Sequence, residues 1–171
     1  MSEGVMTSMN DSEQVAVQAA KEVIYDKNCV FLDVDVQSDV DAIRYLAEQL
    51  YKQGRVKEQY LTRIVEREAE YPTGLLCGAI NVAVPHTEVE LVNQKTLGIA
   101  VLKNPVKFHR MDAPDELVDV SVLFMFALTE AHAHVEMLQK VFEFIQGEGN
   151  LAALTGAKTL DQVLAVLDER L

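Results

Sequence analysis

Apolar residues recur at helical spacing in two segments of the first half of the chain. Between Ser38 and Gly54 the apolar side chains lie three or four positions apart, which is the period of an α-helix with one buried face. Ser38 has the position of an N-cap with acidic residues in the first turn after it, and Gly54 ends the segment. A second helix is predicted over Glu58 to Glu70, and the Pro-Thr-Gly sequence at 72–74 ends it.

The middle of the chain changes to the pattern of β-strands. Residues 81–84 form a short apolar run closed by Pro85, and the residue before a proline favours extended geometry. Further strands are predicted over 97–102 and 118–128, the second rich enough in Val, Leu and Phe to be central in a sheet. Residues 106–108 are expected to add a short edge strand.

Helical spacing returns over 135–145, and Gly147 and Gly149 interrupt it. Thr159 and Gln162 have the spacing of a capping box for a last helix. Two helices, several strands and two helices predict a single α/β domain whose mixed sheet is flanked by helices. We expect this domain to cover residues 13–171 after a disordered leader at 1–12.

Composition excludes several classes of function. The net charge of −12 over 171 residues disfavours nucleic acid and anionic lipid, because binding to phosphates needs an excess of Lys and Arg. Cys29 and Cys77 lie far apart and are expected to be reduced and half-buried. The first residues lack the pattern of a signal peptide, and no apolar run is long enough to span a bilayer. These features predict a cytoplasmic protein.

The candidate chemistry lies in the histidines. The chain has no phosphate-binding glycine loop, nucleophile elbow or HExxH sequence. His86 follows a predicted strand and a proline, where a strand end delivers a side chain to a loop. Because histidine titrates near neutrality, His86 is either a reactive group or an ordinary surface or half-buried histidine. His109, in a polar turn, is expected to be solvated.

His132 and His134 form an HxH pair that could suggest a metal site. Residues two apart on a helix do not share a face, so the pair chelates well only in extended chain. The helical pattern from Val135 onward therefore disfavours a metal. A hydrolase that uses a metal on His86, His132 and His134 is a third alternative, which elemental analysis of the protein would test.

Arg63 and Arg67 lie on one face of the second helix. Such a face is usually solvated and paired with acids. The alternative is that one guanidinium binds a phosphate in a bidentate manner.

The sequence REAEYPTG at residues 67–74, followed by NVAVPH at 81–86, resembles enzyme IIA of the bacterial phosphoenolpyruvate-dependent sugar phosphotransferase system. It fits the fructose/mannitol class, and in detail it is most similar to the galactitol-specific IIA branch. The similarity covers about residues 25–171. It implies the mixed-sheet fold of that class, and it implies a phosphotransferase component that needs no cofactor and no metal.

The resemblance also implies the site residues and the partners. His86 would be phosphorylated by the carrier HPr and would pass the phosphate to a cysteine of a IIB component, with a IIC permease involved indirectly. Arg67 matches the family arginine near this histidine. His134 matches a second histidine that some members carry. An acidic residue that mannitol-type members have between the threonine and the histidine is missing here from Thr73 to His86. A regulatory IIA-like module that senses phosphorylation state is the alternative function.

Overall fold

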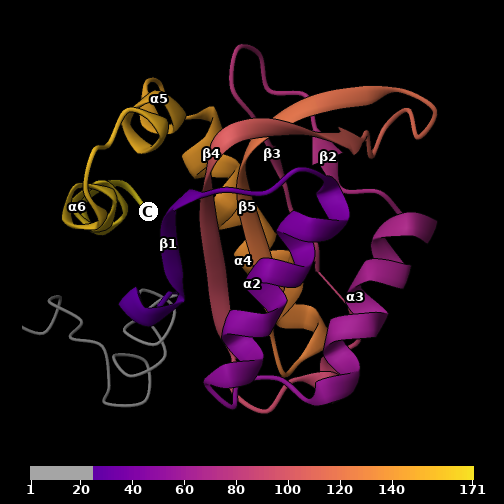
Figure 1. The fold of residues 1–171 in the computed structure, drawn as a ribbon. Helices are drawn as coiled ribbons and strands as arrows, with labels where there is room; N and C mark the ends of the chain where they lie inside the picture. The colour runs from indigo at the N-terminus through magenta and orange to yellow at the C-terminus, as the bar shows by residue number, and fades with distance from the viewer. Residues whose placement is uncertain (1–24) are drawn as a thin grey trace, which may run out of the picture.

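The computed structural model describes residues 25–171. The predicted leader at 1–12 and the first part of the predicted domain lie outside the described residues. Within the described part, a five-stranded sheet stands between two layers of helices (Figure 1). The helices and strands are β1 (Val30–Val34), α2 (Asp39–Lys52), α3 (Glu58–Glu70), β2 (Gly74–Leu75), β3 (Asn81–Ala83), β4 (Thr96–His109), β5 (Leu117–Ala127), α4 (Ala131–Gln146), α5 (Asn150–Thr155) and α6 (Leu160–Arg170), with short 3-10 turns η2 (Lys27–Cys29) and η3 (Val89–Leu91).

The sheet is mixed, as the sequence predicted. Its strand order is β1-β4-β5-β3-β2. β1 runs parallel to β4, and β3 runs parallel to β5, whereas β4 and β5 form a long antiparallel pair. β2 pairs antiparallel with β3 at the edge of the sheet. This order places the end of β3 beside the end of β5, where the chain leaves both strands toward the same side.

Each face of the sheet has its own hydrophobic core. α2 and α3 cover one face, and α4, α5 and α6 cover the other (Figure 1). Because successive strand side chains point to opposite faces, Ala100 and Leu102 of β4 contribute to the first core and Ile99 and Val101 to the second. Burial of these two apolar faces, rather than helix propensity, accounts for most of the stability of such helices.

The predicted helix starts are confirmed at atomic detail. The Ser38 hydroxyl accepts a hydrogen bond from the backbone N–H of Asp41 at 3.1 Å, and that of Thr159 accepts one from Gln162 at 3.2 Å. Each cap satisfies one of the N–H groups that the first turn of a helix leaves without a partner. The Gln162 side chain bonds the N–H of Lys158 at 2.6 Å, one residue before the position that a standard capping box uses.

The structure differs from the predicted elements in four places. Residues 97–102 and 106–108 belong to one strand, β4, in which the pairing register shifts between Val101 and Val106. Three elements were missed: β1, which precedes the first helix, the two-residue strand β2, and α5, a helix of six residues. β1 is an edge strand with an irregular burial pattern, and α5 is too short to show a helical period.

Cys29 is buried and Cys77 is exposed, and neither forms a disulfide, so the expectation that both are half-buried was wrong. Within residues 25–171, every helix is too short or too polar to cross a membrane.

Candidate functional site

The site is built around the loop that leaves β3. The N–H of Phe126 donates to the carbonyl of Pro85 at 3.1 Å, which continues the parallel pairing of β3 and β5 past the end of β3. The N–H of His86 donates to the carbonyl of Val84 at 2.5 Å and closes a tight turn there. Proline fixes its own φ angle and restricts the residue before it. His86 is therefore held at the carboxyl end of a strand, as the sequence predicted.

The ring of His86 is half-buried and fixed from two sides. Its Nδ1 lies 3.1 Å from the carbonyl oxygen of Val84, and its plane stacks on Phe126 with 6.1 Å between ring centroids. A carbonyl oxygen only accepts, so the bond requires a proton on Nδ1 and leaves Nε2 with its lone pair when the ring is neutral. Burial lowers the pKa of His86, and the positive charge of Arg67 lowers it further, while the bond to Val84 acts in the opposite direction.

His134 lies next to His86. It comes from the first turn of α4, and the centroids of the two rings are 5.3 Å apart at an angle of 57°. Its Nε2 is buried and has no hydrogen-bond partner among residues 25–171. Burial and the neighbouring His86 both lower the pKa of His134. Two adjacent rings with lowered pKa are both neutral near pH 7.

Arg67 lies in the last turn of α3. Its guanidinium carbon is 4.2 Å from the centroid of the Tyr71 ring, a cation–π contact. Glu70 pairs instead with Arg63, at 3.2 Å, and no carboxylate within residues 25–171 forms an ion pair with Arg67. The two arginines of this helix face thus differ, since Arg63 is bound by acids and Arg67 keeps its charge available.

A pocket of about 300 Å³ joins the three candidate residues. It is lined by Arg67, His86, Thr87, Glu88, Val89, Glu90, Ala131 and His134. The structure therefore brings Arg67 of α3, His86 of the β3 loop and His134 of α4 into one place. A neutral imidazole beside a guanidinium suits the transfer of an anionic group to a ring nitrogen.

The acid nearest His86 in sequence, Glu88, already has hydrogen-bond and ion-pair partners. Glu88 accepts from Nε of Arg63 at 2.8 Å and from the hydroxyl of Thr87 at 2.5 Å. The hydroxyl of Thr87 and the charge of Arg63 lower the pKa of Glu88 to about 2. Glu88 is thus an anion at neutral pH, but a paired one.

His132 does not join the site. Its ring is 78% exposed and lies 3.0 Å from Glu130, whereas His134 packs against His86. The two residues of the HxH sequence point to different partners because they lie on a helix. Among residues 25–171, no three His, Cys, Asp or Glu side chains are arranged to hold a metal ion.

Sequence reasoning missed two buried polar residues, Glu68 and Thr73. Glu68 is 7% exposed and Thr73 is 4% exposed. The Glu68 carboxylate accepts from both the N–H and the hydroxyl of Thr73, each at 2.6 Å. The burial of Glu68 could have been predicted from the helical period, because Glu68 lies four residues after Ile64, at an inward position of α3.

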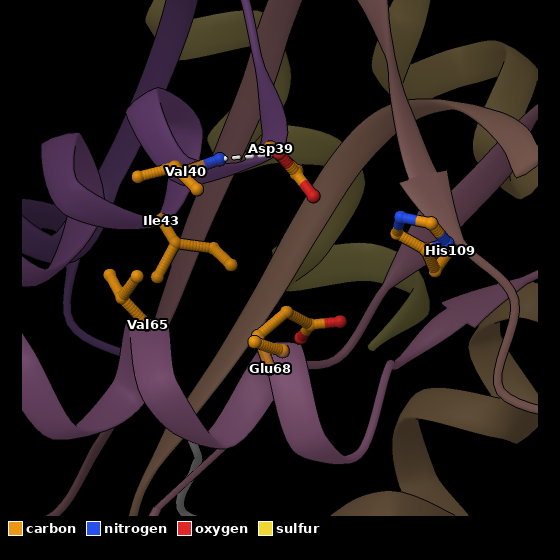
Figure 2. Close-up of a pocket in the computed structure, with 7 residues that line it drawn as sticks. Asp39, Val40, Ile43, Val65, Glu68 and His109 are labelled. Carbon is orange, nitrogen blue, oxygen red and sulfur yellow. Dashed lines mark hydrogen bonds between the residues drawn. The ribbon is translucent and has the colours of Figure 1, made fainter. Parts of the chain in front are cut away.

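Behind Glu68 is a separate cavity of about 220 Å³, shown in Figure 2. Asp39 at the start of α2 and His109 at the end of β4 line it together with Glu68. His109 is exposed as predicted, but it lies in a strand rather than a turn, and its Nδ1 is 2.8 Å from the carbonyl of Pro114. Burial raises the pKa of Glu68 to about 7, the two bonds from Thr73 act in the opposite direction, and the charge of Asp39 raises the pKa further.

Relatives among characterised proteins share this domain. The chain is 27% identical over 162 residues to the PTS system 2-O-alpha-mannosyl-D-glycerate-specific EIIABC component of Escherichia coli, which covers 93% of this chain and 24% of that protein. It is 24% identical over 107 residues to the PTS system galactitol-specific EIIA component of Escherichia coli, covering 62% of this chain and 70% of that one. The chain spans about a quarter of the length of the first of these relatives.

Solved structures have the same fold. PTS IIA (PtxA) from Streptococcus mutans superposes with a TM-score of 0.71 at 25% identity, covering 90% of this chain and 93% of that one. IIA of the Escherichia coli mannitol system, in its complex with phosphorylated enzyme IIB, superposes with a TM-score of 0.69 at 24% identity over 86% of this chain and 99% of that one. The family model described as phosphoenolpyruvate-dependent sugar phosphotransferase system, EIIA 2 matches residues 23–170. With nearly the whole chain matched, and with the helix-flanked mixed sheet of this class in place, the chain belongs to the EIIA 2 family of that phosphotransferase system.

Proposed function

We propose that this chain is a phosphoryl carrier that accepts a phosphoryl group on Nε2 of His86 from HPr and passes it to a IIB component. The observation that carries the proposal is the bond of Nδ1 to the Val84 carbonyl. It leaves Nε2 as the nucleophilic nitrogen of a ring that lines a pocket with Arg67 and His134.

The transfer step needs no added reactant. The lone pair of Nε2 attacks the phosphorus of phospho-HPr, a new N–P bond forms, and the N–P bond to HPr breaks, returning an electron pair to its ring. The proton on Nδ1 of His86 stays in place, held by Val84. The second transfer, to a cysteine thiolate of IIB, breaks the His86 N–P bond in the same way. Phosphoryl transfer of this kind depends on positioning and on stabilising charge in the transition state.

Arg67 and His134 supply that stabilisation. The Arg67 guanidinium is not engaged by a carboxylate, and its planar fork suits two phosphoryl oxygens. An N–H on Nε2 of His134, buried and unpaired, would gain a hydrogen-bond acceptor when a phosphoryl group occupies the neighbouring ring.

The parent system is proposed to be a galactitol permease. The support is the similarity of residues 67–74 and 81–86 to the galactitol branch, together with the galactitol-specific relative. IIA does not contact the sugar, so the system is identified by its acceptor. Phosphate should move from this chain to the IIB of the galactitol system faster than to the IIB of the mannitol or mannosylglycerate system. Because HPr and IIB are the proposed partners, we propose that the chain acts in the cytoplasm, with the IIC permease as an indirect partner.

The test of the carrier function is incubation of the full chain with phosphoenolpyruvate, enzyme I and HPr, followed by mapping of the label. We expect one phosphate, labile in acid and stable in alkali, which His86→Gln abolishes. His132→Gln is the matched control, since this ring lies outside the pocket and should leave the labelling unchanged. Label retained in His86→Gln, or label on His134, would overturn the proposal. Labelled protein that delivers phosphate to none of the IIB components would instead support the regulatory module.

A further inference from the structure

Hydrogen bonds, continued through the backbone of Val84, join the buried carboxyl of Glu68 to the ring of His86. We infer that Glu68 is a positioning residue that holds His86, through Thr73 and Val84, in the orientation that leaves Nε2 free. The inference rests on the proposed function of His86 and assigns a role in it to a residue that does not touch the phosphoryl group.

The first link joins Glu68 to Thr73. The two carboxyl oxygens bond separate groups of one residue, the N–H and the hydroxyl of Thr73, at 2.6 Å each. Both partners are buried. Burying a carboxyl costs free energy unless its bonds compensate. The bond to the N–H holds the carboxyl in place, and the bond that the Thr73 hydroxyl donates fixes the direction of the hydroxyl proton.

The second link joins Thr73 to Val84. The N–H of Val84 is shared between the Thr73 hydroxyl at 3.2 Å and the Thr73 carbonyl at 3.3 Å. The hydroxyl can accept from Val84 because its proton is directed to Glu68. β2 has only two residues, Gly74 and Leu75. The pairing of Thr73 with Val84 extends this short ladder by one step, so its geometry depends on the side chain of Glu68 as well as on the sheet.

The third link joins Val84 to His86. The Val84 carbonyl accepts from both the N–H and the Nδ1 of His86, at 2.5 and 3.1 Å. The direction of this carbonyl therefore sets both the turn and the ring. The N–H and the carbonyl of Val84 belong to successive peptide groups, so Thr73 acts on the carbonyl through the backbone of Val84. Because a misplaced reacting group can slow a transfer roughly 10²-fold, a remote carboxyl that fixes this backbone can act on the reaction.

Figure 2 shows Glu68 at the wall of the cavity that it shares with Asp39 and His109. Glu68 does not line the His86 pocket. Its effect is therefore expected on kcat and on the state of the ring, and not on the KM for HPr.

The experiment compares full-length wild type with four variants. Glu68→Gln keeps the shape of the side chain but, at a pH above 7 where the carboxyl of Glu68 is ionised, replaces an acceptor by a donor facing Thr73. Thr73→Val removes the hydroxyl at nearly constant volume, and Thr73→Ser restores it. Glu58→Gln, an exposed acid in the first turn of α3, is the matched control. Two quantities are measured on folded protein: the rate of phosphorylation by phospho-HPr, and the ¹⁵N chemical shifts of the His86 ring, which report its tautomer.

We expect Glu68→Gln and Thr73→Val to lower kcat roughly 10- to 100-fold with KM unchanged. Both should reduce the population of the tautomer protonated on Nδ1, while Thr73→Ser and Glu58→Gln behave as wild type. Should Glu68→Gln fail to fold, Thr73→Val tests the same chain of bonds.

Unchanged kcat and unchanged ¹⁵N shifts in a folded variant would overturn the inference, as would a rise in KM alone. The two proposals fail separately. Wild type that takes no phosphate refutes the carrier function, whereas the tautomer comparison still decides the role of Glu68.

Discussion

The buried carboxyl of Glu68 makes the stability of this protein depend on pH in a direction opposite to that of most acids. Burial raises the pKa of Glu68 from its ordinary 4.5 to about 7. Between these values the folded chain holds a proton that the unfolded chain has released. The stabilisation is therefore complete below pH 4.5 and is lost as the pH rises through 7. Exposed acids paired with cations, such as Glu88, have lowered pKa values and act the other way.

The perturbation is Glu68→Gln, which removes the titration and keeps the volume. A pKa difference of one unit corresponds to about 1.4 kcal/mol, so between pH 5 and pH 8 wild type should lose roughly 2–3 kcal/mol relative to the variant. Contributions of the groups that Glu68 does not influence, directly or through Thr73 and Val84, cancel in this difference. The side chain is 7% exposed, so solvent screens this effect little.

Urea denaturation of both proteins at pH 5 and pH 8 gives the two free energies of unfolding. Glu58→Gln serves as the control, because this carboxyl is exposed and takes no part in the buried bonds of Glu68. A difference between wild type and Glu68→Gln that is the same at the two pH values would refute the reasoning. A difference that grows in favour of wild type at pH 8 would show that Glu68 is stabilised as an anion.

Three further outcomes are expected. Arg67→Lys, which keeps the charge but loses the planar fork, should slow phosphorylation of His86 roughly 10- to 100-fold and change the unfolding free energy by less than about 0.5 kcal/mol; a wild-type rate in Arg67→Ala would remove Arg67 from the site. His134→Gln should still accept phosphate on His86, but more slowly, as single-turnover labelling would measure; loss of all labelling in the folded variant would contradict this. Tyr60→Phe removes the hydrogen bond, 3.2 Å long, that the buried Tyr60 hydroxyl donates to the Phe126 carbonyl. This should lower the unfolding free energy measured in urea by about 1 kcal/mol and leave the transfer rate unchanged. An unchanged unfolding midpoint would show that the bond does not stabilise the fold.

Long elements with a clear period were predictable from the sequence. α2 and α3 have regular apolar spacing and a cap or stop at their ends, and both were placed within a residue or two. The sequence prediction divided β4 into two strands because Lys103 and Asn104 are polar and Pro105 lacks an N–H. In the structure these three residues are exposed, at the place where the pairing register shifts. A register shift in a strand leaves no periodic signal in one sequence.

The candidate site was predictable where the resemblance supplied the residues, and less so elsewhere. His86 and His134 lie 5.3 Å apart between ring centroids, although 48 positions separate them in the chain. Periodicity cannot bring two such residues together, because their proximity follows from the order of strands in the sheet. Glu68 could have been noticed as an acid on an inward helix position. Its bonds to Thr73 could not, since they depend on how the chain turns after α3.

The three candidate site residues that line the pocket come from three different layers. Arg67 belongs to the helices on one face of the sheet, His134 to those on the other, and His86 to the sheet between them (Figure 1). Any protein that covers His86 must therefore touch both helix layers at once and hold them together at this edge. When such a partner binds, amide hydrogen exchange should slow in the last turn of α3 and in the first turn of α4. These two segments are far apart in the sequence. Partner binding would then reduce local opening on both faces of the sheet, and each phosphoryl transfer would be accompanied by a transient loss of flexibility in both helix layers.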